Sequence, residues 1–83
     1  MNFTQHALDK LERYGIDPER ILEASKDALH NLHDTQEKSQ IKIINYRGVL
    51  LALVIDPESQ NLVTVYRTDD RTIENRRKGG RWT

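Results

Sequence analysis

Three side chains near the amino terminus could form a reactive surface. His6, Lys10 and Arg13 stand at positions i, i+4 and i+7, and at about 100° per residue they share one stripe of a helix. An imidazole can take up or release a proton near neutral pH, and neighbouring cations can hold an anion beside it. The alternative is an ordinary solvated helix face, because such stripes are common.

A second set of polar side chains lies between residues 64 and 76. Guanidinium groups match phosphate oxygens, and hydroxyls donate hydrogen bonds to the same oxygens or to ribose. In a strand, Thr64, Tyr66 and Thr68 would face one side and Arg67 the other, so only one of these groups can face a ligand beside His6. The alternative is that this segment holds good strand formers and surface ion pairs. The set comprises Thr64, Tyr66, Arg67, Thr68, Asp69, Arg71, Thr72, Asn75 and Arg76.

The charge is unevenly distributed, although the chain has 13 basic and 13 acidic residues. Residues 1–66 carry an acidic excess and residues 67–83 a basic one. A basic end on an acidic domain suggests an anionic partner, either RNA or an acidic protein. The alternative is a solvated tail that only increases solubility. The candidate nucleic-acid-binding cations are Arg13, Arg71, Arg76, Arg77, Lys78 and Arg81.

Trp82 is the one aromatic residue in this basic end. It could stack on a nucleic-acid base. Equally, it could fold back and cover an edge of a small core, because large aromatic side chains are usually mostly buried. The sequence leaves open whether residues 77–83 are ordered.

The sequence predicts no metal or cofactor site. His30, His33 and Asp34 have the spacing of a partial metal site, but the chain has no cysteine, and only His6 could add a third imidazole from another helix. Glycine patterns of the P-loop and Rossmann kinds are absent, as is a nucleophile elbow.

Hydrophobic periodicity and turn signals predict a single α+β domain over residues 1–83. Apolar residues at helical spacing indicate one helix from about Phe3 to Tyr14, and Asp17-Pro18 begins a second that we expect to reach about Asn31. We expect residues 34–39 to form a loop, followed by a three-stranded antiparallel meander over 41–46, 49–55 and 62–66. Residues 68–70 could cap a short last helix through Arg77.

Composition also constrains the compartment. The longest apolar run, Val49 to Ile55, is far too short to span a bilayer, and the amino terminus lacks a signal-peptide pattern. Because the chain has no cysteine, nothing indicates an oxidising environment. We therefore expect a cytoplasmic protein without a membrane partner.

The order of these segments resembles a family of small phage- and toxin-associated domains of unassigned function. The motifs are a helix with His-x-x-x-Arg/Lys, here His6 to Lys10, a Gly-Ile turn, here Gly15-Ile16, and a late strand, here Leu62 to Tyr66. The chain is also loosely similar to metal-independent ribonucleases that include RelE-type toxins and colicin-type tRNA nucleases. Those proteins place helices before an antiparallel sheet.

The resemblance implies cleavage of RNA by transesterification, in which the ribose 2′-OH loses a proton and attacks phosphorus. His6 would then be the base or acid. Lys10, Arg67 and Arg76 would hold the phosphate, Thr64 or Thr68 would supply hydroxyl donors, and Trp82 would stack a base. An antitoxin-like or other acidic protein would be a second partner.

Two other classes of function remain open. One is a non-catalytic module that binds nucleic acid or protein through the basic carboxyl-terminal segment. The other is a small interaction protein that pairs through a free sheet edge. Catalysis requires His6 to lie near the strand that contains Thr64, whereas binding alone requires the carboxyl-terminal cations to share a face.

Overall fold

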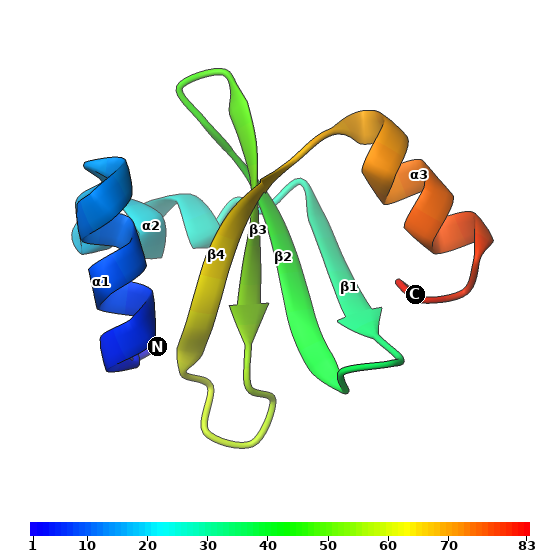
Figure 1. Cartoon of the computed structure of the whole chain (residues 1–83), viewed down its shortest axis with the longest axis horizontal. Coiled ribbons are helices and arrows are strands. Elements are labelled where there is room, and N and C mark those ends of the chain that lie inside the picture. Colours follow the sequence, from blue (N-terminus) through cyan, green and yellow to red (C-terminus); the bar gives the residue numbers. More distant parts are fainter.

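The computed structural model describes residues 1–83 as an α+β fold with an antiparallel sheet (Figure 1). The four strands form a meander in the order β1-β2-β3-β4. The helices are α1 (Gln5–Tyr14), α2 (Pro18–Ser25) and α3 (Asp70–Lys78), and the strands are β1 (His30–Asp34), β2 (Ser39–Tyr46), β3 (Val49–Ile55) and β4 (Leu62–Thr68). No helix is long and apolar enough to cross a lipid bilayer.

The strand β1 corrects the expectation of three strands and of a second helix reaching about Asn31. The helix α2 ends at Ser25, whose hydroxyl donates to the carbonyl of Leu22 over 2.7 Å. The amide of Leu29 already donates to the carbonyl of Ile43 in β2, over 2.7 Å. Residues 28–32 fit a helical period, but pairing with β2 buries Leu32 in the core, and this tertiary contact overrides the local pattern.

The helix boundaries elsewhere follow local chemistry that the sequence displays. Thr4 accepts from the amide of Ala7 and caps α1, and Gly15 ends that helix with a φ of 69°. Asp17 caps α2 just before a proline. Asp69 caps α3 by accepting from the amide of Thr72 over 2.7 Å. The short last helix is therefore confirmed.

The sheet carries a hydrophobic core on each face. Successive side chains along β2, β3 and β4 point to opposite faces of the sheet. One face packs against α1 and α2, with a buried cluster of Ala7, Leu11, Ile21, Ile44, Leu51, Leu53, Ile55, Leu62 and Val65. The other face packs against α3 and the tail, with a smaller cluster of Leu32, Ile41, Ile43, Ala52, Ile73 and Trp82.

The two chain ends bond to the two outer strands. Phe3 forms a parallel bridge with Leu62 in β4, and the amide of Leu62 donates to the carbonyl of Asn2 over 2.7 Å. At the other edge, the amide of Thr83 donates to the carbonyl of His33 in β1 over 2.9 Å. Part of each edge is thus satisfied within the chain, which reduces the surface available for edge pairing.

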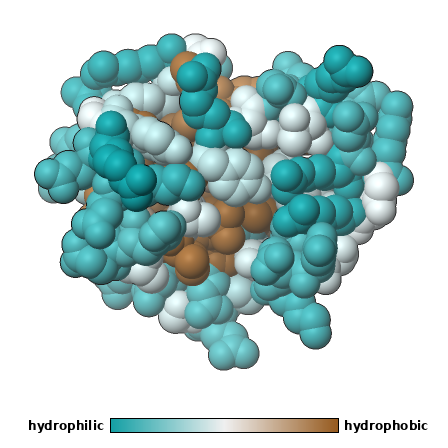
Figure 2. Space-filling view, in the orientation of Figure 1, coloured by the Kyte–Doolittle hydropathy of each residue, from teal (hydrophilic) through white to brown (hydrophobic).

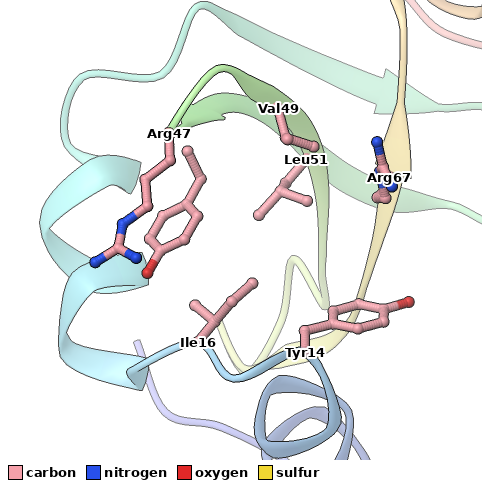
Figure 3. Close-up of a pocket in the computed structure, with 7 residues that line it drawn as sticks. Tyr14, Ile16, Arg47, Val49, Leu51 and Arg67 are labelled. Carbon is pink, nitrogen blue, oxygen red and sulfur yellow. The ribbon is translucent and has the colours of Figure 1, made fainter.

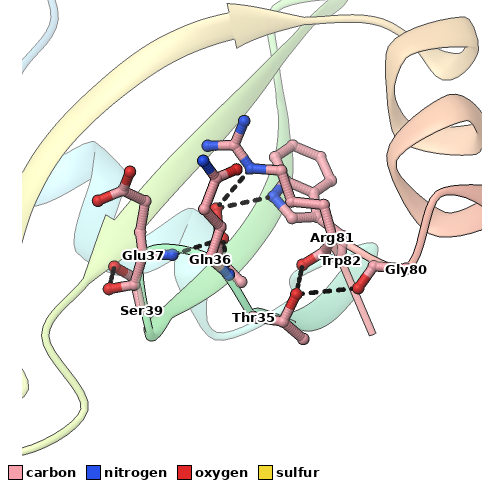
Figure 4. A network of polar contacts seen from close by, with 8 residues as sticks. Thr35, Gln36, Glu37, Ser39, Gly80, Arg81 and Trp82 are labelled. Carbon is pink, nitrogen blue, oxygen red and sulfur yellow. Dashed lines mark hydrogen bonds and ion pairs between the residues drawn. The ribbon is translucent and has the colours of Figure 1, made fainter.

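A buried carboxylate holds the tail against the sheet (Figure 4). Asp34 is 2% exposed. Its Oδ1 accepts from the amides of Gln36 and Glu37 over 3.0 and 2.9 Å, and its Oδ2 accepts from Arg81 Nε and Trp82 Nε1 over 3.3 and 3.2 Å. Burial raises the pKa of Asp34, but these hydrogen bonds and the Arg81 charge outweigh burial, and the pKa lies below its ordinary value.

We expect Asp34→Asn to lower the free energy of unfolding by about 2 kcal/mol. An amide nitrogen accepts no hydrogen bond, so placing it at Oδ2 leaves both Arg81 Nε and the buried Trp82 Nε1 without this acceptor. Urea denaturation followed by circular dichroism measures the change. Asp27→Asn is the matched control, because Asp27 is exposed. Equal stability of the two variants would contradict the role of Asp34.

Because the pKa of Asp34 is lowered in the folded protein, we expect the protein to lose stability in acid. Because the folded pKa of Asp34 is lowered, its contribution is fully present above the unfolded pKa and is lost as the pH falls through the folded pKa. The free energy of unfolding of the natural sequence should therefore fall more steeply below about pH 4 than that of Asp34→Asn. Asp69, whose pKa is also lowered, is unchanged in both proteins. Identical acid slopes would refute this account.

Candidate functional site

The side chains of His6 and Lys10 converge on Thr64. Hydrogen bonds from Thr4 to the carbonyls of Leu62 and Val63, over 3.0 and 3.1 Å, fix the start of α1 against β4. One helical turn separates His6 from Lys10, so both reach the same strand. His6 Nε2 lies 3.4 Å from Thr64 Oγ1, and Lys10 Nζ donates to that oxygen over 3.3 Å.

Tyr66 extends this group along the same face of β4. Its ring centroid lies 6.0 Å from Lys10 Nζ, and the residue is half-buried. Burial raises the pKa of Tyr66, while the positive charges of Arg76 and Arg81 act in the opposite direction, and the net shift is upward. The phenol is therefore protonated at neutral pH and can donate a hydrogen bond.

An open hollow of about 320 Å³ lies over this part of the sheet. Thr64, Tyr66 and Val54 line it from β4 and β3, and Arg81 lines it from the tail. The acidic residues Asp34 and Glu37 line it from the end of β1 and the turn that follows. Figure 2 shows apolar and pale surface over the middle of the molecule, with hydrophilic side chains on either side. We call the group of His6, Lys10, Thr64, Tyr66, Arg76 and Arg81 the cationic cradle.

Two residues of the expected catalytic set lie elsewhere. Arg67 points to the opposite face of β4 from Thr64, as strand alternation requires, and lines a different pocket. Thr68 shares a face with Thr64 but lies about 13 Å further along the strand, and its hydroxyl is buried without a hydrogen-bond partner. The structure therefore does not bring Arg67 or Thr68 to His6.

Some of the carboxyl-terminal cations contact buried residues, and the others are exposed. Trp82 folds back into the core and is 1% exposed, so its ring has no free face on which a base could stack. The guanidinium of Arg76 lies 4.8 Å from the centre of that ring, and Arg81 pairs with Asp34. The remaining cations of α3, Arg71, Arg77 and Lys78, are exposed, as is Arg13 on α1.

The histidines of β1 do not form a site together. His30 and His33 are three residues apart in a strand, which places them on opposite faces of the sheet. No group of three or more His, Cys, Asp or Glu side chains is arranged to hold a metal ion.

We expect Tyr66 to ionise at a pH above the ordinary value for tyrosine, because burial raises its pKa. Titration by ultraviolet absorbance, with Tyr66→Phe to identify its signal, measures this difference. Arg76→Gln should raise the pKa further, because the Arg76 charge favours the phenolate. A Tyr66 signal at the ordinary pKa of tyrosine would show that the ring is not desolvated.

Comparison of the chain with protein-family models, with curated proteins and with solved structures found no match in any of the three. The toxin-like resemblance therefore rests on its short sequence motifs, and the assignment of a site rests on the convergence of side chains from α1, β4 and the tail.

Proposed function

We propose that this protein is a metal-independent ribonuclease of the toxin type that cleaves RNA by attack of the ribose 2′-OH on the adjacent phosphate. One observation carries the proposal. His6 Nε2 and Lys10 Nζ lie 3.4 and 3.3 Å from the same hydroxyl, that of Thr64. A base, a cation and a hydrogen-bond donor within one small region are the groups that this reaction needs.

His6 acts as the general base in this mechanism. Its imidazole is exposed at the edge of the sheet and can reach a ribose. Nε2 takes the proton from the 2′-OH, and the oxygen then forms a bond to phosphorus. In the free protein Nε2 lies 3.4 Å from the Thr64 hydroxyl, and the 2′-OH takes the place of that hydroxyl when RNA binds, because the nitrogen has a single lone pair.

Lys10 and Tyr66 act on the phosphate and the leaving group. The Lys10 ammonium stabilises the added negative charge of the pentacoordinate phosphorus. The departing 5′-oxygen takes a proton from the Tyr66 phenol, which is protonated because its pKa is raised. The products are a 2′,3′-cyclic phosphate and a 5′-hydroxyl, so the proton lost to His6 is balanced by the proton gained from Tyr66.

The arginines on the far side of the cradle hold the RNA strand. Arg76 and Arg81 lie close enough to act on Tyr66 electrostatically. A phosphate of a neighbouring nucleotide can bind between them. Tyr66 replaces Trp82 as the ring on which a base can stack, because Trp82 is buried.

The proposal also names a substrate, an inhibitor and a cellular location. The substrate is RNA, and an antitoxin-like acidic protein that covers the cationic cradle is the natural inhibitor. We place the protein in the cytoplasm, where a chain without cysteine needs no oxidising environment.

A purely electrostatic binding module is less well supported. At about 100° per residue, Arg76 and Arg77 lie about 140° and 240° around α3 from Arg71. The cations therefore surround the helix and do not form one binding face.

We expect the purified protein to cleave RNA in the presence of EDTA and His6→Ala to reduce the rate by about 10²- to 10⁴-fold, as loss of a general base does. His33→Ala is the matched control, because His33 is exposed on β1, away from the cradle. Cleavage is measured by gel electrophoresis, and the 2′,3′-cyclic phosphate is identified by mass spectrometry.

Other outcomes of this assay would overturn the proposal. Intact RNA that is retained on the gel in a salt-sensitive manner would favour a binding module. Intact RNA without retention would favour a protein partner. Cleavage that is equal in His6→Ala and the natural sequence would remove His6 from the mechanism.

A further inference from the structure

A second pocket lies on the opposite face of the sheet from the cationic cradle (Figure 3). Its volume is about 320 Å³. The lining residues Ile16, Val49 and Leu51 are aliphatic and come from the α1–α2 loop and β3. These side chains form an apolar surface that can hold one large side chain of a ligand.

Aromatic and cationic side chains line the pocket in two pairs. Tyr46 and Arg47 stand together where β2 turns into β3, and the Arg47 guanidinium lies 5.4 Å from the Tyr46 ring centre. Figure 3 shows Tyr14 and Arg67 on the other side of the pocket. Tyr14 is 44% exposed, which is unusual for so large a ring and leaves it available for contact.

The backbone at Arg47 is one that arginine rarely adopts. Arg47 and Gly48 have φ angles of 52° and 85° and form the tight turn between β2 and β3. Such turns favour asparagine followed by glycine, and a left-handed conformation costs another residue about 1 kcal/mol or more. The arginine is therefore better explained by its side chain, at the mouth of the pocket, than by the needs of the turn.

The charges of the pocket are unbalanced. Neither Arg47 nor Arg67 belongs to an ion pair, since the ion pairs of the structure involve other residues. No acidic residue lines the pocket, although Glu23 and Asp27 line a neighbouring hollow that Arg47 also borders. An occupant that complements this pocket is apolar at its centre and negatively charged on two sides.

We propose that this pocket binds an extended segment of a partner protein, in which an aromatic or large aliphatic side chain fills the pocket and flanking carboxylates pair with Arg47 and Arg67. Tyrosine and arginine around an apolar centre are the residues that dominate protein interfaces. A nucleotide fits less well, because the polar atoms of the lining belong to the tyrosines and arginines at its sides, and the aliphatic centre offers none to the edges of a base. The proposal is independent of RNA cleavage, because the cradle lies on the other face.

The test begins with phage display of random peptides on the immobilised full-length protein. We expect the selected peptides to share one large apolar residue with aspartate or glutamate on both sides. A synthetic peptide of that sequence is then titrated by fluorescence polarisation. Arg47→Gln combined with Arg67→Gln should weaken binding by about tenfold or more, and Tyr14→Ser should weaken it as well.

Lys26→Gln is the control, because Lys26 is exposed and outside the pocket, and it should bind as the natural sequence does. Circular dichroism melts verify that each variant is folded. Selections without a shared sequence would overturn the proposal, as would peptides that bind the double variant equally well. Saturable binding of AMP, with amide shifts confined to the pocket in NMR spectra, would overturn it in favour of a nucleotide site.

Discussion

The carboxylate of Asp34 is the contact on which the second core and the tail side of the cationic cradle depend. It sits at the end of β1 and accepts hydrogen bonds from the following turn and from Arg81 and Trp82 in the tail. Four donors compensate for its burial, which an unpaired carboxylate could not tolerate. By holding the tail, Asp34 places the indole over Leu32 and Ile43 and fixes Arg81 beside the open part of the sheet.

The unequal covering of the sheet creates the candidate site. Two helices cover one face, while α3 and the tail cover only part of the other. Thr64 and Tyr66 on β4 therefore remain partly exposed between α1 and the tail. Because such a residue is half-buried, packing fixes its position while the exposed part of its side chain can still contact a ligand. The same geometry brings cations from two distant parts of the chain to one surface.

The two faces of β4 separate two kinds of chemistry. Thr64 joins His6 and Lys10, whereas Arg67 lines the pocket formed with Tyr14 and the β2–β3 turn. The period of two in a strand makes this separation unavoidable. A single strand thus contributes to two surfaces, and the residues on one face say little about the role of those on the other.

The helix starts, the α+β class and the three strands from β2 to β4 could be predicted from the sequence alone, because caps, turns and short apolar runs act over a few residues. The sequence also determined that His6 and Lys10 share a stripe. Contacts within the folded chain were needed to show that residues 30–34 form a strand, that Trp82 enters the core, and that His6 and Lys10 of α1 reach Thr64 of β4. Those outcomes depend on contacts between segments far apart in the chain, and local patterns carry no information about which segments meet.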